Sequence, residues 1–149
     1  MNTIGLNNIA AHPAPADIKV LIVDDQSTMR RIIKRSLRKI GITEAHPAEN
    51  GAAALEWLNF PSNPSPDIII CDLHMDTMDG LEFANTVRRG KGGPDKAIPI
   101  LLLTGESDKM LLEVAEQVGV TQVLPKPISP QDLGIAIANA LGYQLIEPV

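Results

Sequence analysis

The sequence predicts an α/β fold in which a parallel sheet is covered by helices on both faces. Short apolar runs of strand length alternate five times with segments of helical periodicity. Two of the runs, 67–71 and 98–103, are apolar at nearly every position rather than at every second one. Such strands are buried on both faces, and their alternation with helices is typical of parallel βαβ units joined by right-handed crossovers.

The first two strand and helix pairs are predicted between residues 19 and 60. Residues 19–23 (KVLIV) form an apolar strand, and the helix over 27–40 has Ser27 as its N-cap and Gly41 as its stop. Its expected core positions recur every three to four residues and are Met29, Ile33, Leu37 and Ile40. A short strand over 43–48 and a helix over 50–60 follow, and the loop PSNPSP ends that helix.

The remaining three pairs are predicted by the same signals. Strands are expected over 67–71, 98–103 and 120–124, and helices over 79–89, 107–118 and 130–141. Ser129 and Pro130 are a good N-cap and first-turn pair for the last helix. One domain therefore spans 18–141, with a flexible N-terminal extension over 1–17 and a C-terminal tail over 142–149.

Composition excludes several classes of protein. The 149 residues are 44% hydrophobic and 21% charged, as in ordinary soluble proteins. No apolar run approaches the roughly 20 residues of a membrane helix, and the N-terminal segment lacks the features of a targeting sequence. The single cysteine, Cys71, excludes an internal disulfide and a cysteine-based zinc site. We expect a cytoplasmic protein without membrane association.

The charges are unevenly distributed along the chain. The net charge of −5 argues against nucleic-acid binding. Nevertheless, six of the thirteen basic residues lie on the first helix, at Arg30, Arg31, Lys34, Arg35, Arg38 and Lys39. This helix face is either simply solvated or a docking surface for an acidic partner.

Polar residues follow four of the five predicted strands. Asp24 and Asp25 end the first, Asp72 the third and Thr104 the fourth, and Lys126 follows the fifth. The carboxyl ends of parallel strands share one edge of the sheet, where open α/β sheets bind ligands. A single aspartate at a strand end is usually a cap or turn residue, but four such features together favour a site.

The residue types at this edge indicate phosphoryl chemistry on a metal. Three carboxylates repel one another unless a divalent cation lies between them, and hard oxygen ligands favour Mg²⁺. Lys126 and Thr104 supply an ammonium and a hydroxyl for phosphoryl oxygens. The set is suited to placing a phosphoryl group on a carboxylate.

Four segments in order resemble the receiver domain of bacterial two-component response regulators, of the stand-alone, chemotaxis-receiver-like type. They are VLIVDDQ (20–26), IIICDLHMDTMDG (68–80), ILLLTGE (100–106) and LPKP (124–127). The resemblance covers 18–141 and implies a flavodoxin-like, doubly wound (βα)5 fold with strand order 2-1-3-4-5.

The resemblance also implies a role for each site residue. Asp72 would accept the phosphoryl group, while Thr104 and Lys126 would bind its oxygens. Mg²⁺ would be held by carboxylates and one backbone carbonyl, contributed by Asp25, Asp72 and His74, with Asp24 acting through a bound water. The peptide bond from Lys126 to Pro127 would be cis.

The sequence departs from the family pattern at three places. Val123 stands where an aromatic residue is usual, Asp76 stands where proline is common, and the loop over 89–97 is longer. His74 and Glu106 lie two residues after Asp72 and Thr104, where they would flank the path of the hydrolytic water.

The expected function is a signalling switch rather than an enzyme. A histidine kinase or histidine phosphotransfer protein would donate the phosphoryl group, and an unknown output protein would bind the result. We expect no output domain after residue 141, and Met110 or Leu112 on the fourth helix would be exposed for such a partner. A phosphorelay intermediate and a phosphorylation-independent scaffold remain alternatives.

Overall fold

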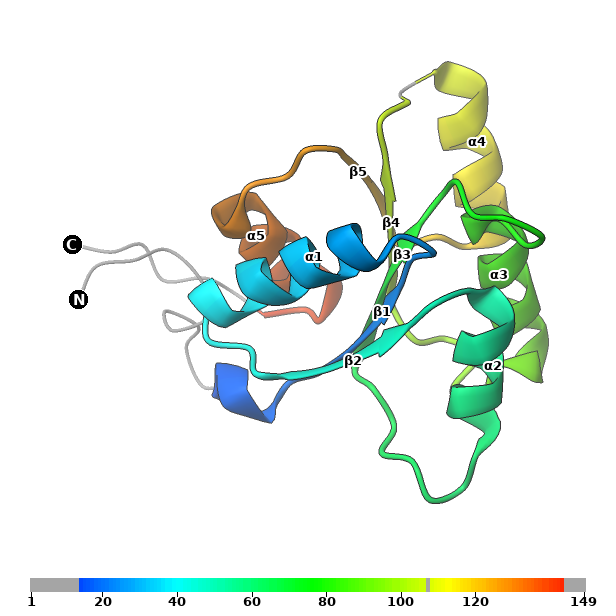
Figure 1. Cartoon of the computed structure of the whole chain (residues 1–149). Helices are drawn as coiled ribbons and strands as arrows, with labels where there is room; N and C mark the ends of the chain where they lie inside the picture. Colours follow the sequence, from blue (N-terminus) through cyan, green and yellow to red (C-terminus); the bar gives the residue numbers. More distant parts are fainter. Residues whose placement is uncertain (1–13, 107, 144–149) are drawn as a thin grey trace.

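A five-stranded parallel sheet forms the centre of the computed structural model, which describes residues 14–106 and 108–143. Its order is β2-β1-β3-β4-β5, and all neighbouring strands are parallel. The predicted topology is therefore confirmed (Figure 1). The strands are β1 (Lys19–Val23), β2 (Glu44–Ala48), β3 (Ile68–Asp72), β4 (Ile100–Thr104) and β5 (Gln122–Pro125).

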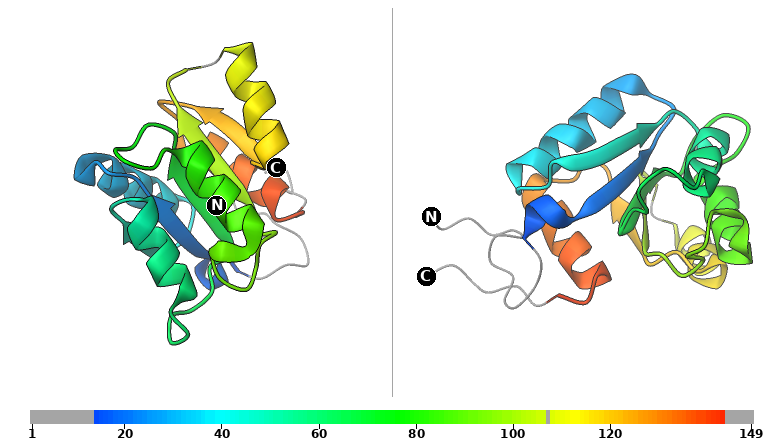
Figure 2. Two further views of the ribbon diagram at one scale, coloured as in Figure 1. Left: turned by 90° about the vertical axis from the view of Figure 1, so that its right-hand side faces the viewer. Right: turned by 90° about the horizontal axis from the view of Figure 1, so that it is seen from below.

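Helices cover both faces of the sheet. The first layer contains α1 (Ser27–Lys39) and α5 (Pro130–Ala140), and the opposite layer contains α2 (Gly51–Asn59), α3 (Gly80–Thr86) and α4 (Lys109–Val118). Figure 1 shows the two layers on either side of the sheet, and the left view of Figure 2 shows the second layer in front. A short 3-10 helix, η2 (Pro15–Asp17), precedes β1.

Two hydrophobic cores lie against the two sheet faces. Because successive strand residues point to opposite faces, β3 sends Ile68 and Ile70 into the core below α1 and α5. The alternate residues Ile69 and Cys71 enter the core below α2, α3 and α4. Every residue of β3 and β4 is buried, which explains why these segments are apolar without alternation.

The start of α1 differs from the prediction. Gln26, not Ser27, is the N-cap, and its side chain makes no capping hydrogen bond. The Asp24 carboxylate instead accepts a hydrogen bond from the backbone N–H of Gln26 at 2.9 Å. Ser27 is the first helical residue rather than the cap, because the Gln26 carbonyl already accepts the first helical hydrogen bond, from Arg30 N–H at 3.1 Å. By contrast, the predicted cap of α5 is confirmed, since Ser129 Oγ accepts from Asp132 N–H.

Other helix boundaries moved by a few residues. The helix predicted over 79–89 ends at Thr86 and continues into a π-helical turn, η3 (Val87–Lys91), in which Gly90 has a φ of 84°. The helix predicted from residue 107 begins at Lys109 behind the N-cap Asp108, and residue 107 lies outside the described residues. Of the predicted extension over 1–17 and tail over 142–149, residues 1–13 and 144–149 lie outside the described residues, whereas 15–17 form η2.

Burial follows the predicted helix faces. Ile33, Leu37 and Ile40 of the first helical segment are buried, and Met29 packs against the same core. On α4, both Met110 and Leu112 are exposed, at 74% and 45%. Within residues 14–106 and 108–143, none of the helices is long and apolar enough to cross a membrane.

Candidate functional site

The strand register brings the predicted site residues to one edge. Val23 pairs with Cys71, so Asp24 and Asp72 lie side by side one step further along β1 and β3. Thr104 pairs with Pro125, which places Lys126 directly beyond the same edge. The residues are far apart in the sequence, and the parallel pairing alone aligns them.

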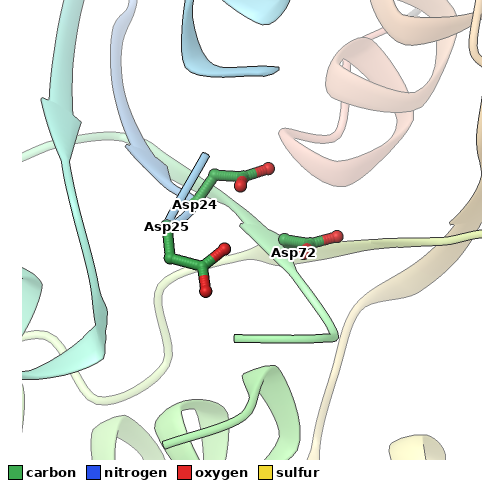
Figure 3. Close-up of side chains that lie close together, drawn as sticks. All are labelled: Asp24, Asp25 and Asp72. Carbon is green, nitrogen blue, oxygen red and sulfur yellow. The ribbon is translucent and has the colours of Figure 1, made fainter. Parts of the chain in front are cut away.

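Three carboxylates converge at this edge. Asp24, Asp25 and Asp72 each offer one oxygen, and these oxygens lie within 4.8 Å of one another. Figure 3 shows the three side chains at the adjoining ends of β1 and β3. Asp24 and Asp72 are 0% and 5% exposed, whereas Asp25 is more accessible. The predicted acidic cluster is therefore assembled in the structure.

Asp24 is buried with an incomplete set of hydrogen bonds. Its Oδ1 accepts from Gln26 N–H, while its Oδ2 is buried and lacks a hydrogen-bond partner. Burial raises the pKa of Asp24, and the neighbouring Asp72 and Asp25 raise it further, whereas the Gln26 N–H and Lys126 act in the opposite direction. An unpartnered buried carboxylate oxygen fits a site that receives a cation.

Lys126 forms an ion pair with Asp72. Its Nζ lies 2.6 Å from Asp72 Oδ1, and the side chains are 24% and 5% exposed. The two groups are not aligned as a hydrogen bond, since Oδ1 is buried without a hydrogen-bond partner. The peptide bond from Lys126 to Pro127 is cis, as the family resemblance implied.

The local charge is unbalanced. Three carboxylates face a single ammonium at this edge, and two unit charges 4.8 Å apart repel by about 3 kcal/mol at an effective dielectric constant near 20. Protonation of Asp24 or binding of a divalent cation relieves this repulsion. The donor set consists of hard oxygens only, which fits Mg²⁺ better than softer metals.

Thr104 lies beside the acidic cluster without a described bond to it. The side chain is 1% exposed, and its Oγ1 accepts a hydrogen bond from Glu106 N–H at 3.0 Å. The carbonyl of Thr104 accepts from Lys126 N–H at 2.9 Å. The bond from Lys126 ties the ends of β4 and β5 together, and the bond from Glu106 holds the hydroxyl at the edge of the site.

A pair that the sequence did not predict spans the loops after β3 and β4. His74 Nε2 lies 2.8 Å from Glu106 Oε1, with both side chains exposed. Both positions were singled out in the sequence, but nothing in it indicated that they would meet. His74 is one of the residues that line an open hollow of about 720 Å³, together with Asp25, Gln26, Met75, Asp76 and Asp79. The carbonyl role predicted for His74 stays a prediction.

The structure also shows what surrounds the two residues that depart from the family pattern, Val123 and Asp76. Val123 is partly buried and packs against the core below α2, α3 and α4. Asp76 donates its backbone N–H to Asp25 Oδ2 at 3.1 Å. A proline at position 76 would lack this donor, so the hydrogen bond depends on the departure.

A sheet of order 2-1-3-4-5 with carboxylates and a lysine at its carboxyl edge defines a receiver-type, flavodoxin-like domain. Comparison with known proteins agrees with this class. The protein-family model for the response regulator receiver domain matches residues 20–138 of this chain.

Relatives and solved structures of the same kind match most of the chain. The chemotaxis protein CheY1 of Helicobacter pylori is 37% identical over 84% of this chain and 98% of that protein. A CheY homolog of Campylobacter jejuni is 38% identical over 84% and 93%. The structure of Vibrio cholerae CheY4 is 33% identical, with a TM-score of 0.73 over 83% and 98% of the two chains.

The chain belongs to the response regulator receiver domain family. Its family is part of two-component signal transduction, and the relatives named above are chemotaxis proteins. The resemblance predicted from four sequence segments is therefore confirmed.

Proposed function

We propose that this domain is a signalling switch that accepts a phosphoryl group on Asp72 in a Mg²⁺-dependent reaction. The observation that carries the proposal is the ion pair of Lys126 with Asp72 inside a cluster of three carboxylates. The lysine accompanies one carboxylate, and that carboxylate is therefore the one on which a charged group is best stabilised.

The chemistry transfers a phosphoryl group from a phosphohistidine. One oxygen of Asp72 attacks phosphorus in line, the P–N bond breaks as the P–O bond forms, and the bond electrons return to the donor imidazole. Bound Mg²⁺ would neutralise charge on the phosphoryl oxygens and would be held by Asp25, Asp72 and the carbonyl of His74, with Asp24 acting through water. Lys126 stabilises charge on the same oxygens.

Thr104 couples the site to the surface in this proposal. Its hydroxyl is held by Glu106 N–H and is free to donate its proton to a phosphoryl oxygen. Movement of this hydroxyl shifts an existing equilibrium between two surface conformations. The small side chain at Val123 transmits less of that movement than an aromatic ring would.

The basic face of α1 is the proposed docking surface for the phosphodonor, a histidine kinase or histidine phosphotransfer protein. Arg30 connects this face with the site, because its Nη1 donates to the Asp24 carbonyl at 2.8 Å. Complementary charge accelerates encounter with an acidic partner. The exposed apolar residues of α4 are the proposed contact for the output protein and are Met110, Leu112 and Val114.

The test is phosphorylation by a small phosphodonor such as acetyl phosphate, followed by intact mass. Wild type with Mg²⁺ gains the mass of one phosphoryl group, and chelation of Mg²⁺ prevents the gain. Asp72→Asn remains unmodified, whereas the control Asp76→Asn, which changes a carboxylate in the same hollow, is still modified. Phosphorylation of Asp72→Asn would contradict the assignment of the phosphoacceptor, and an unmodified wild type would favour the scaffold alternative.

Back-transfer separates the proposed switch from a phosphorelay intermediate. The phosphorylated protein is mixed with an unphosphorylated histidine phosphotransfer protein, and the label on each is followed with time. A switch loses its phosphoryl group mainly to water. Rapid appearance of the label on histidine would assign this chain to a relay.

A further inference from the structure

One hydrogen bond links the acidic cluster to the loop between β3 and α3. The backbone N–H of Asp76 donates to Asp25 Oδ2 at 3.1 Å. The two residues are 51 positions apart, and the bond is made by the backbone of residue 76 rather than by its side chain. Any residue except proline supplies such a donor.

The loop holds this N–H in place through a strained turn. Met78 N–H donates to the Asp76 carbonyl at 2.8 Å, which closes a three-residue turn around Thr77. Thr77 has a φ of 70°, a conformation that costs free energy in a β-branched residue and occurs mainly where neighbours impose it. Met78 packs closely over Gly51, where an added Cβ atom would lie 2.7 Å from its Sδ.

The same bond stands between two hollows. Asp25 and Asp76 line the open hollow of about 720 Å³ at the acidic edge. They also line a second hollow of about 360 Å³, which extends towards the start of α2. Within residues 14–106 and 108–143, the N–H of residue 76 is the hydrogen-bond donor that orients the Asp25 carboxylate between these two hollows.

We propose that residue 76 is a positioning residue of the cation site and acts through its backbone N–H on Asp25. The bond restrains rotation of the carboxylate and leaves its second oxygen available to a cation. Hydrogen bonds to metal ligands orient them, and their loss weakens metal binding. This inference rests on the magnesium site of the proposed function.

The test compares two variants that differ in one backbone hydrogen. Asp76→Ala removes the side-chain carboxylate and keeps the N–H, whereas Asp76→Pro removes both. Mg²⁺ affinity is measured by calorimetric titration in the absence of any phosphodonor, so the result does not depend on phosphorylation. We expect Asp76→Pro to bind Mg²⁺ about tenfold more weakly than Asp76→Ala. Equal affinities in the two folded variants would overturn the inference.

A second measurement does not depend on the proline variant. In the metal-free protein, the amide of residue 76 is compared between wild type and Asp25→Ala by NMR and hydrogen exchange. Loss of the acceptor should shift this amide proton upfield and accelerate its exchange. An unchanged amide would overturn the inference. Failure of wild type to bind Mg²⁺ would instead reject the magnesium site on which the inference rests, and the two results are therefore distinguishable.

Discussion

Asp24 is the residue whose charge costs the folded state free energy. Its side chain is fully buried, one oxygen has no partner, and two further carboxylates lie close by. Burial raises its pKa above the ordinary value of 3.8. The metal-free protein therefore loses stability as pH rises through the raised pKa, and stability is restored by a cation or by removal of the charge.

We expect Asp24→Asn to stabilise the metal-free protein at neutral pH. The substitution removes a charge that repels Asp25 and Asp72, so the free energy of unfolding should rise by at least about 1 kcal/mol. Urea unfolding in a chelator measures this. The variant should also gain less stability from Mg²⁺ than wild type does. A variant that is less stable than wild type in chelator would contradict this account.

His46 supplies a second pH dependence, far from the phosphoacceptor. Its ring stacks on Trp57 with centroids 4.4 Å apart and planes at 17°. Burial, and secondarily the charge of Lys34, lowers the pKa of His46 below its ordinary value of 6.5. The unfolded chain therefore binds a proton more readily, and the folded state loses stability as pH falls below about 6.5.

We expect substitution of His46 to make the stability of the fold less dependent on pH. In His46→Phe, which keeps a ring against Trp57, unfolding midpoints at pH 7.5 and 5.5 should lie closer together than in wild type. Urea unfolding at the two pH values measures the difference. An identical difference in both proteins would show that His46 does not carry this part of the pH dependence.

At the scale of the element, neighbouring residues of α4 have different roles, one in the stability of the fold and one in the proposed partner binding. Leu111 is 9% exposed and belongs to the core, whereas the adjacent Met110 is 74% exposed. Leu111→Ala should lower the free energy of unfolding by about 2–4 kcal/mol because it leaves a cavity. Met110→Ala should change it by less than about 0.5 kcal/mol. Equal losses in the two variants would contradict the burial of this helix.

The basic side chains of α1 are available to a partner. Within residues 14–106 and 108–143, no carboxylate forms an ion pair with its cations. Reversal of Arg31 and Arg35 to Glu tests docking without Arg30, whose guanidinium holds the Asp24 carbonyl. We expect about tenfold slower phosphotransfer from a histidine phosphotransfer protein at low salt, with unchanged labelling by acetyl phosphate.

The control for this prediction reverses Arg89 and Lys91, two exposed cations at the end of η3. This double variant changes the net charge by the same amount but leaves α1 intact. Its transfer rate should stay near that of wild type. If both double variants slow transfer equally, net charge rather than the α1 surface controls the encounter.

At the scale of the whole molecule, cation binding should stabilise the fold. The three carboxylates are brought together only in the folded state, so Mg²⁺ binds that state preferentially. Stability should rise by about 1.4 kcal/mol for each tenfold excess of Mg²⁺ above its dissociation constant. Thermal unfolding at several Mg²⁺ concentrations measures the slope. Asp25→Asn should move the onset of this rise to higher Mg²⁺ concentrations, and an onset unchanged in that variant would exclude Asp25 as a ligand.

The sequence predicted the fold well because the signals are local. Strands buried on both faces must be apolar throughout, as β3 and β4 are, and each helix shows its buried positions by spacing. The sequence also predicted which residues meet at the carboxyl edge, since parallel pairing aligns strand ends whatever their separation. The Ser27 cap was wrong because the helical hydrogen bonds begin one residue earlier, at the Gln26 carbonyl, and periodicity does not fix a helix end to the residue.

Contacts between loops were decided only by the tertiary structure. Neither the approach of His74 to Glu106 nor the bond from residue 76 to Asp25 follows from spacing, because loops lack the repeating geometry that makes strands and helices predictable. The free oxygen of Asp24 likewise depends on what surrounds it after folding. Residue type and order thus determined the architecture and the chemistry at its edge, and packing determined which of those groups touch.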